Sequence, residues 1–274
     1  MRVGMCSNAN FALGEEDSAK RLETIANCGF DYLETQLAPL VTLTDKVFQD
    51  VVRRLDDLHI PCRVSLLLFP AKTALVGDRV DFPFLKDFAE RAVNRACQIG
   101  SEIIVFGHGG TRSYKDAVSK EEAYADLLRI LGMVGDIAEK HSIKIAIEPL
   151  NKKETNMFIC YREVITILQE IKRENVGGLC DWYHAWIEKQ DPDEMNIMPE
   201  KLFHLHIAYP DGRTVPSHQD DMNIYKPFLA AVKKTGYHDK ISIAAKIPDL
   251  PNYYPLFQEG LMVIKQLLNE YGLE

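Results

Sequence analysis

The chain has 274 residues, of which 46% are apolar and 26% charged, as in an ordinary globular protein. Its formal net charge of −8 argues against a nucleic-acid partner, because proteins that bind phosphate backbones carry a basic face. A chain of this length can form one large domain, and we expect a single domain over residues 1–274.

No sequence signal directs the chain to a membrane. The opening segment MRVGMCSNANF lacks the basic stretch and apolar run of a signal peptide. No stretch approaches the roughly 20 apolar residues of a spanning helix. Six scattered cysteines without a CxxC pair are typical of reduced thiols. We therefore expect a cytoplasmic protein with no membrane partner and no disulfide framework.

Short β-branched or apolar runs alternate along the chain with longer segments of helical periodicity. The predicted strands begin at Val3, Phe30, Cys62, Glu102, Lys144, Val176, Leu202 and Ile241. Amphipathic segments such as 18–28, 86–100 and 121–141 predict the helices between them. This alternation indicates βαβ units and a parallel sheet, and eight units close into a (β/α)8 TIM barrel. A doubly wound sheet is the alternative, but the Gly-rich turn that it usually has after its first strand is missing.

Alternation within the strands predicts which side chains face the barrel interior, because every second residue shares a face. The apolar faces that suit the helix layer contain Ile145, Ile147, Phe203, Leu205, Ile207, Ile241 and Ile243. The opposite faces contain Glu148, His204, His206, Ala244 and Lys246. We expect these five residues to point into the barrel.

Three ligand-type residues end three consecutive predicted strands: Glu148, Asp181 and His206. The carboxyl ends of barrel strands converge on one mouth, so these side chains can meet there. Two carboxylates and one imidazole suit Mn²⁺, our first expectation, or Mg²⁺ or Co²⁺, while zinc is less favoured. Taken alone, each residue is more simply explained as a polar group at a loop edge that pairs with a local base. Their common position predicts a divalent metal site.

Four segments resemble the sugar isomerase/epimerase superfamily, whose members have a xylose-isomerase-like barrel. They are FGHGGTRSY from Phe106, EPLNKKETN from Glu148, DWYHAWIE from Asp181 and HLHIA from His204. The chain is most similar to the D-tagatose 3-epimerase/D-psicose 3-epimerase branch, over essentially its whole length. The resemblance implies a metal-dependent ketose 3-epimerase or sugar isomerase of carbohydrate metabolism. It also implies a homo-oligomer.

The resemblance implies further roles for individual residues. Glu154 and His184 would hydrogen-bond the sugar, and Arg213 would contact its hydroxyl groups. Arg213 lies one residue further beyond the histidine His206 than the family pattern leads us to expect. Glu34, at the end of the second predicted strand, is compatible with a pocket position, a salt bridge or a helix cap.

Position 244 departs from the family pattern. The last strand of the family would read ISIEAK, whereas this chain has ISIAAK, with Ala244 in place of glutamate. The resemblance implies that Glu148, Asp181 and His206 bind the metal and that Glu148 is also an acid/base group. The absent glutamate would be the fourth ligand and the second acid/base group.

Epimerisation beside a ketone removes a proton from one face of a carbon and returns one to the other face, through a cis-enediolate. With Ala244, one face has no base, and such a loss typically costs about 10²–10⁴-fold in rate. We therefore predict a nearly inactive epimerase. Three explanations fit: a deliberate substitution that traps substrate, a changed reaction that uses Glu148 alone or with water, and a partial charge replacement by Lys246.

Further pocket candidates lie near the strand ends: Met5, Asn8, Phe11, Phe69, His108, Arg112, Trp182, Tyr183 and Trp186. The segment GHGGTR is a candidate anion cradle for a phosphorylated sugar, although we expect a free ketose. A keto-inositol dehydratase and a non-catalytic metal-dependent sugar-binding protein remain as alternatives. A hydrolase resembling endonuclease IV is disfavoured by the dispersed histidines and the negative net charge.

Overall fold

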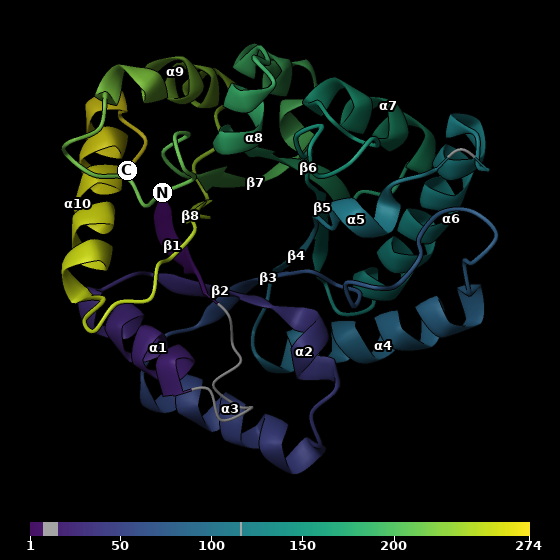
Figure 1. Ribbon diagram of the computed structural model, residues 1–274, viewed down its shortest axis with the longest axis horizontal. Coiled ribbons are helices and arrows are strands. Elements are labelled where there is room, and N and C mark those ends of the chain that lie inside the picture. The colour runs from purple at the N-terminus through teal and green to yellow at the C-terminus, as the bar shows by residue number, and fades with distance from the viewer. Residues whose placement is uncertain (8–15, 116) are drawn as a thin grey trace.

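The computed structural model of the chain describes residues 1–7, 16–115 and 117–274. Its strands are β1 (Arg2–Cys6), β2 (Tyr32–Gln36), β3 (Cys62–Leu66), β4 (Ile103–Phe106), β5 (Lys144–Ile147), β6 (Val176–Asp181), β7 (Leu202–Ile207) and β8 (Lys240–Ile243). All neighbours pair in parallel, and β1 pairs with β8 to close the barrel (Figure 1). The predicted (β/α)8 TIM barrel is confirmed.

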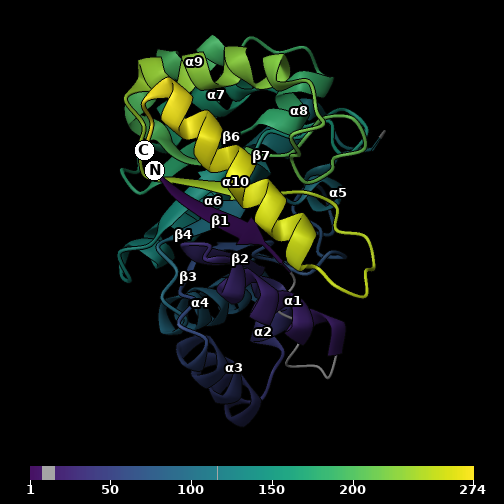
Figure 2. The same ribbon diagram turned by 90° about the vertical axis from the view of Figure 1, so that its left-hand side faces the viewer.

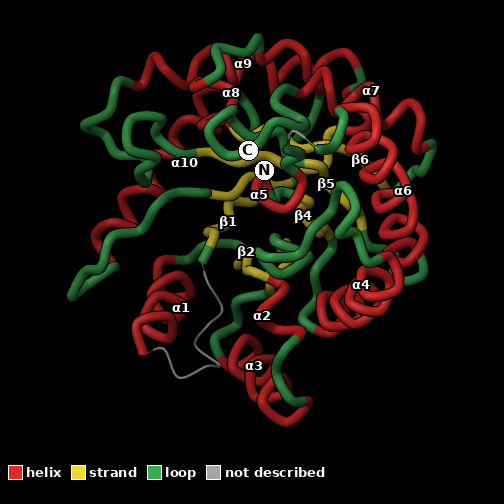
Figure 3. The backbone as a smooth tube through the Cα atoms, turned by 45° about the vertical axis from the view of Figure 1, so that its right-hand side comes forward, coloured by secondary structure: helices red, strands yellow, loops and turns green. Residues whose placement is uncertain are grey.

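Helices surround the strands, as Figures 2 and 3 show. The helices are α1 (Glu16–Cys28), α2 (Leu37–Val41), α3 (Asp45–Asp57), α4 (Phe82–Gln98), α5 (Gly109–Arg112), α6 (Lys120–Glu139), α7 (Tyr161–Ile171), α8 (Trp182–Ile187), α9 (Lys226–Thr235) and α10 (Tyr254–Tyr271). Short 3-10 helices span Pro192–Ile197, Pro199–Lys201 and Met222–Tyr225. Within the described residues, no helix is both long and apolar enough to cross a membrane.

Local sequence explains where several helices begin and end. At the start of α6, the Ser119 hydroxyl accepts from the Glu122 N–H and the Glu122 carboxylate accepts from the Ser119 N–H. This reciprocal pair satisfies two donors that the first helical turn leaves without partners. At the start of α4, the Asp81 carboxylate accepts one such hydrogen bond, from the N–H of Phe84. Gly236 ends α9 at a φ of 72°, a conformation that costs glycine little.

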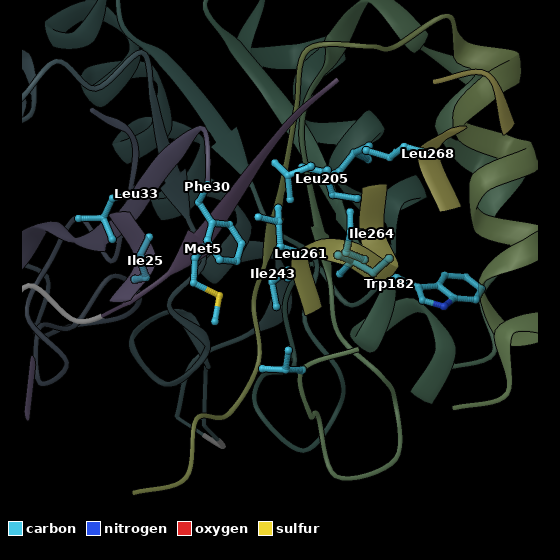
Figure 4. Packing of buried hydrophobic residues seen from close by; sticks show 14 of the residues in the cluster. Met5, Ile25, Phe30, Leu33, Trp182, Leu205, Ile243, Leu261, Ile264 and Leu268 are labelled. Carbon is cyan, nitrogen blue, oxygen red and sulfur yellow. The ribbon is translucent and has the colours of Figure 1, made fainter. Parts of the chain in front are cut away.

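The main apolar core lies between the strands and the helix layer. Figure 4 shows Leu205 and Ile243 beside Leu261 and Ile264 of α10, with Met5 of β1 nearby. A smaller apolar cluster fills part of the barrel interior, and it contains Tyr32, Val64, Ile103, Val105, Ala146, Leu179 and Phe203. The helices are therefore held by the outward faces of the strands, and the inward faces remain available for polar groups near the mouth.

The predicted strand faces agree with this packing at all but one position. Ile145 and Ile147 pack in the helix-side core, as do the apolar residues predicted for β8. Phe203 was expected on the helix side, and this prediction is wrong, because it packs with the interior cluster. The register between β6 and β7 shifts there: Gly178 pairs with Leu202, and the next residue of β6 pairs with His204. Phe203 is the extra residue of a β-bulge, which interrupts the alternation.

Candidate active site

A cavity of about 460 Å³ opens at the carboxyl ends of the strands. Its lining includes Glu148, Glu154, His184, His206 and Arg213, which the family resemblance implied, whereas the buried Asp181 is not part of the lining. Ala244 and Lys246 also line it, as do Cys6, Arg21 and Gln36. This is the face on which barrel enzymes build their active sites.

The structure brings Glu148, Asp181 and His206 together. Glu148 directly follows β5, Asp181 is the last residue of β6, and His206 lies near the end of β7. One ligand atom from each residue lies within 4.8 Å of the others, and all three residues are buried. The Nδ1 atom of His206 is 2.9 Å from Glu148 Oε1 and 3.8 Å from Asp181 Oδ2. This oxygen-rich donor set with one imidazole nitrogen fits a hard or borderline divalent cation.

Gly107 leaves the space that the Glu148 carboxylate occupies. A Cβ atom built on Gly107 would lie 2.0 Å from Glu148 Oε2, far inside an ordinary contact distance. The backbone N–H of Glu148 donates to the carbonyl of Phe106, so the strand end itself is anchored to β4. The absence of a side chain at Gly107 therefore determines where the carboxylate of Glu148 points.

Arg112 anchors the backbone around Glu148. The side chain is fully buried, and its guanidinium donates to the carbonyl oxygens of Phe106, Glu148, Met157 and Phe158. Burial lowers the pKa of Arg112 to about 10. Arg112 does not line the cavity, so its guanidinium does not form the anion cradle for which GHGGTR was a candidate, in line with the preference for a free ketose. Its donors are used by the protein backbone.

The charges within the cluster support one another. Burial alone would raise the pKa of Asp181, but His184, His206 and Arg213 hold it well below its usual range. Burial alone would lower the pKa of His206, but the charges of Glu34 and Glu148 hold it well above its usual range. The cluster thus favours an ionised Asp181 with a cation beside it, either a proton on the His206 ring or a metal ion.

Glu34 lies beneath His206 and is fully buried. Its Oε1 atom is 2.9 Å from His206 Nε2, and its Oε2 atom is 3.0 Å from His204 Nε2. His204 Nε2 also lies 3.1 Å from the Ser242 hydroxyl, which contacts the Tyr32 hydroxyl at 2.8 Å. Of the three roles that the sequence leaves open for Glu34, the structure shows the ion pair, with His204 and His206 as partners. The contacts form a polar column through the barrel interior.

The residues implied as sugar ligands surround the open side of the cluster. His184 Nδ1 accepts from the N–H of Asn151 at 3.1 Å, which leaves the ring proton on Nε2. That Nε2 atom is buried and has no hydrogen-bond partner within the described residues. Glu154 Oε1 accepts from the Asn151 amide and lies 3.9 Å from Arg213. The nearest carboxylate oxygen, Asp181 Oδ2, is 3.6 Å away, beyond hydrogen-bond distance, so the Nε2 group of His184 can still bind a molecule in the cavity.

Arg213 reaches further into the cluster than a simple sugar contact requires. Its Nη2 atom donates to Asp181 Oδ2 at 3.1 Å and its Nε atom donates to the carbonyl of Ala244 at 3.0 Å. Its guanidinium also lies over the ring of Tyr183, 4.7 Å from the centroid. Arg213 holds a φ of 55°, and its backbone carbonyl accepts from the N–H of Lys246. The loop after β7 is thus tied to the chain after β8.

Position 244 faces the cavity, as the strand pattern predicts. The N–H of Ala244 donates to the carbonyl of Ile207 at 2.9 Å, so the chain stays paired with β7 beyond the end of β8. Lys246 lines the same cavity and is exposed. No carboxylate from this strand end reaches the cluster.

Most of the other pocket candidates lie elsewhere. Met5, Phe69 and Trp182 are buried in the apolar core, and Trp186 is partly exposed outside the cavity lining. Two further candidates are also outside the lining: His108 is half-buried, and Tyr183 packs against Arg213. Asn8 and Phe11 belong to a segment outside the described residues. Sequence reasoning missed Cys6 and Gln36, although both fall at predicted strand ends, where any inward side chain meets the cavity.

The fold and the cavity define a (β/α)8 barrel with a cation-compatible cluster at its mouth. The chain belongs to the xylose isomerase-like TIM barrel family, whose model matches residues 22–267.

Individual relatives agree with this assignment. An inosose isomerase from Bacillus licheniformis is 22% identical over 268 residues, which cover 93% of this chain and 92% of the relative. A ketose 3-epimerase from Arthrobacter globiformis is 36% identical over 126 residues, or 44% of this chain and 43% of the relative. The crystal structure of a D-allulose 3-epimerase from Methylomonas sp. has the same fold, with a TM-score of 0.81 at 19% identity, covering 97% of this chain and 96% of that one.

Proposed function

We propose that this chain is a divalent-metal-dependent sugar isomerase or epimerase that removes a proton from the carbon beside a ketone. The observation that carries the proposal is the approach of Glu148, Asp181 and His206 to within 4.8 Å at the barrel mouth. Mn²⁺ suits these ligands best, with Mg²⁺ or Co²⁺ as alternatives. When bound, the cation supplies positive charge that stabilises an enediolate. Relatives named as isomerases and epimerases support the same reaction class.

Four side chains that line the cavity have distinct roles in the proposed reaction. The Glu148 carboxylate, whose position Gly107 and Arg112 fix, accepts the proton from carbon. The N–H at His184 Nε2 donates to a substrate hydroxyl, and Glu154 accepts from another. Arg213 holds Asp181 in place while its guanidinium borders the substrate.

Epimerisation needs a second acid/base group on the other face of the substrate. Ala244 cannot act as one, so we expect an epimerase rate about 10²–10⁴-fold below that of a form with glutamate at this position. Lys246 lines the same side of the cavity, and a contribution from its amine is a competing explanation of any residual rate.

A second candidate reaction follows from the single base. Glu148 can take a proton from the carbon that carries a hydroxyl and return it, on the same face, to the former carbonyl carbon. The hydroxyl proton moves to the old carbonyl oxygen, so ketone and alcohol exchange places and no atom is lost. This isomerisation needs one carboxylate rather than two. The inosose isomerase relative, which aligns with nearly the whole chain, favours it.

The experiment supplies Mn²⁺ and a panel of free ketoses and inososes to the wild type, Ala244→Glu, Ala244→Gln and Glu148→Gln. Restored epimerisation in Ala244→Glu but not in its glutamine control supports the two-base scheme. Isomerised product from the wild type, with no gain in Ala244→Glu, supports transfer on one face. Loss of water by mass identifies a dehydratase, and saturable sugar binding without any product identifies a binding protein. Wild-type turnover that survives in Glu148→Gln contradicts the proposed base.

A further inference from the structure

The His206 ring has two functional edges. Its Nδ1 edge faces Glu148 and Asp181, and its Nε2 edge faces Glu34. We propose that Cys6, Glu34 and His206 form a second cation site on this other edge, suited to zinc or another thiophilic divalent ion.

The backbone pairing brings these ligands together. Cys6 is the last residue of β1, and it pairs directly with Glu34 of β2 in the parallel sheet. One ligand atom each from Cys6, Glu34 and His206 lies within 4.8 Å of the others. Glu34 is fully buried, whereas Cys6 is partly exposed and lines the cavity. An ion in the cavity can therefore reach the thiol first.

Ala244 makes this site accessible. The β1–β8 register pairs Met5 with Ile243, so that Cys6 and Ala244 follow side by side, and both line the cavity. Alanine has no side-chain atom beyond Cβ that could stand over the thiol. Ala244 supplies no oxygen ligand to the first cluster, and its small side chain leaves the thiol of Cys6 on the neighbouring strand uncovered.

The donor types of the two clusters differ. The first offers two carboxylates and an imidazole, whereas the second offers a thiol, a carboxylate and an imidazole. Thiolate and imidazole ligands select zinc-like ions, and carboxylates favour manganese and magnesium. Ion binding at the second cluster releases the thiol proton and requires an unprotonated ring nitrogen. Glu34 would keep its other oxygen on His204, which holds the carboxylate in position.

The test is a Co²⁺ titration of the metal-free full chain, read from the near-ultraviolet charge-transfer band of a thiolate bound to cobalt. It does not depend on turnover, so it is independent of the proposed reaction. We expect a saturable band in the wild type, in Glu148→Gln and in Cys97→Ser, which removes an exposed thiol as a matched control. We expect no band in Cys6→Ser.

Zinc competition completes the test. Zn²⁺ is expected to displace the cobalt band, and Cys6→Ser is expected to bind zinc at least about tenfold more weakly. Its affinity for Mn²⁺ and its circular dichroism spectrum are expected to match the wild type. A band that is absent from the wild type, persists in Cys6→Ser or disappears in Glu148→Gln overturns the second site. Unchanged zinc affinity in Cys6→Ser does the same.

Discussion

Gly107 offers the sharpest test of how the site is positioned. In Gly107→Ala the new Cβ would start 2.0 Å from Glu148 Oε2, and ordinary contact begins at 3.4 Å, so the carboxylate has to move by about 1.4 Å. A displacement of about 1 Å at a reacting group can cost about 10²-fold in rate. That factor corresponds to about 2.7 kcal/mol in transition-state stabilisation.

The substitution is expected to leave the fold nearly unchanged, because the atom that clashes is the far end of a flexible side chain. Gly110→Ala is the matched control, since a Cβ built there meets nothing within 4 Å. The assay is kcat/KM on the best substrate of the panel, together with Mn²⁺ affinity by calorimetry. We expect Gly107→Ala to lose about 10²-fold in kcat/KM and roughly tenfold in Mn²⁺ affinity. Values equal to those of Gly110→Ala in both assays refute the reasoning.

Three further predictions concern stability. Arg112→Met should lower the free energy of unfolding in urea by about 3–5 kcal/mol, because it leaves buried carbonyls without their donor, whereas the exposed Arg91→Met should change it by less than about 0.5 kcal/mol. Burial and the charge of Arg112 lower the pKa of His108 from 6.5 to about 4, so the unfolded chain binds more protons in this range. Stability should therefore fall by about 2–3 kcal/mol from pH 6.5 to 4, and His108→Asn should flatten that slope in urea titrations. Mn²⁺ at about 100 times its Kd should stabilise the wild type by about 2.7 kcal/mol, a gain that EDTA removes and Asp181→Asn largely lacks by thermal melting.

The barrel and the first cluster were predictable because they follow from periodicity. Strand-length apolar runs alternate with helical segments, and parallel strands bring their carboxyl ends to one mouth. Glu148 and His206 also fall on the inward parity of their strands, so their meeting needed no knowledge of loops. Phe203 broke the same rule because a bulge depends on the pairing of two strands, and a single strand does not encode it.

Other features depend on contacts that no local pattern carries. Glu34 and His206 are 172 residues apart, and only the closed barrel places them 2.9 Å from each other. In the sequence, Cys6 is one of several scattered thiols. Its neighbours are set by the register between β1 and β2, which the sequence of one strand does not give. From the sequence, Arg112 was a candidate for an exposed loop arginine that binds an anion. The path of the surrounding loops buries it and directs its donors to carbonyl oxygens.

The polar column beneath the site constrains how this sequence can diverge. Glu34 and His204 are both fully buried and bonded to each other, so replacing either one alone leaves a polar group without its partner in the barrel interior. Replacing both with apolar residues of similar volume avoids that cost within the pair, although His206 Nε2 and the Ser242 hydroxyl then each lose one contact. We therefore expect paired substitutions along this column to cost less stability than single ones. A mutational scan that varies one position at a time will underestimate how many sequences the barrel interior accepts.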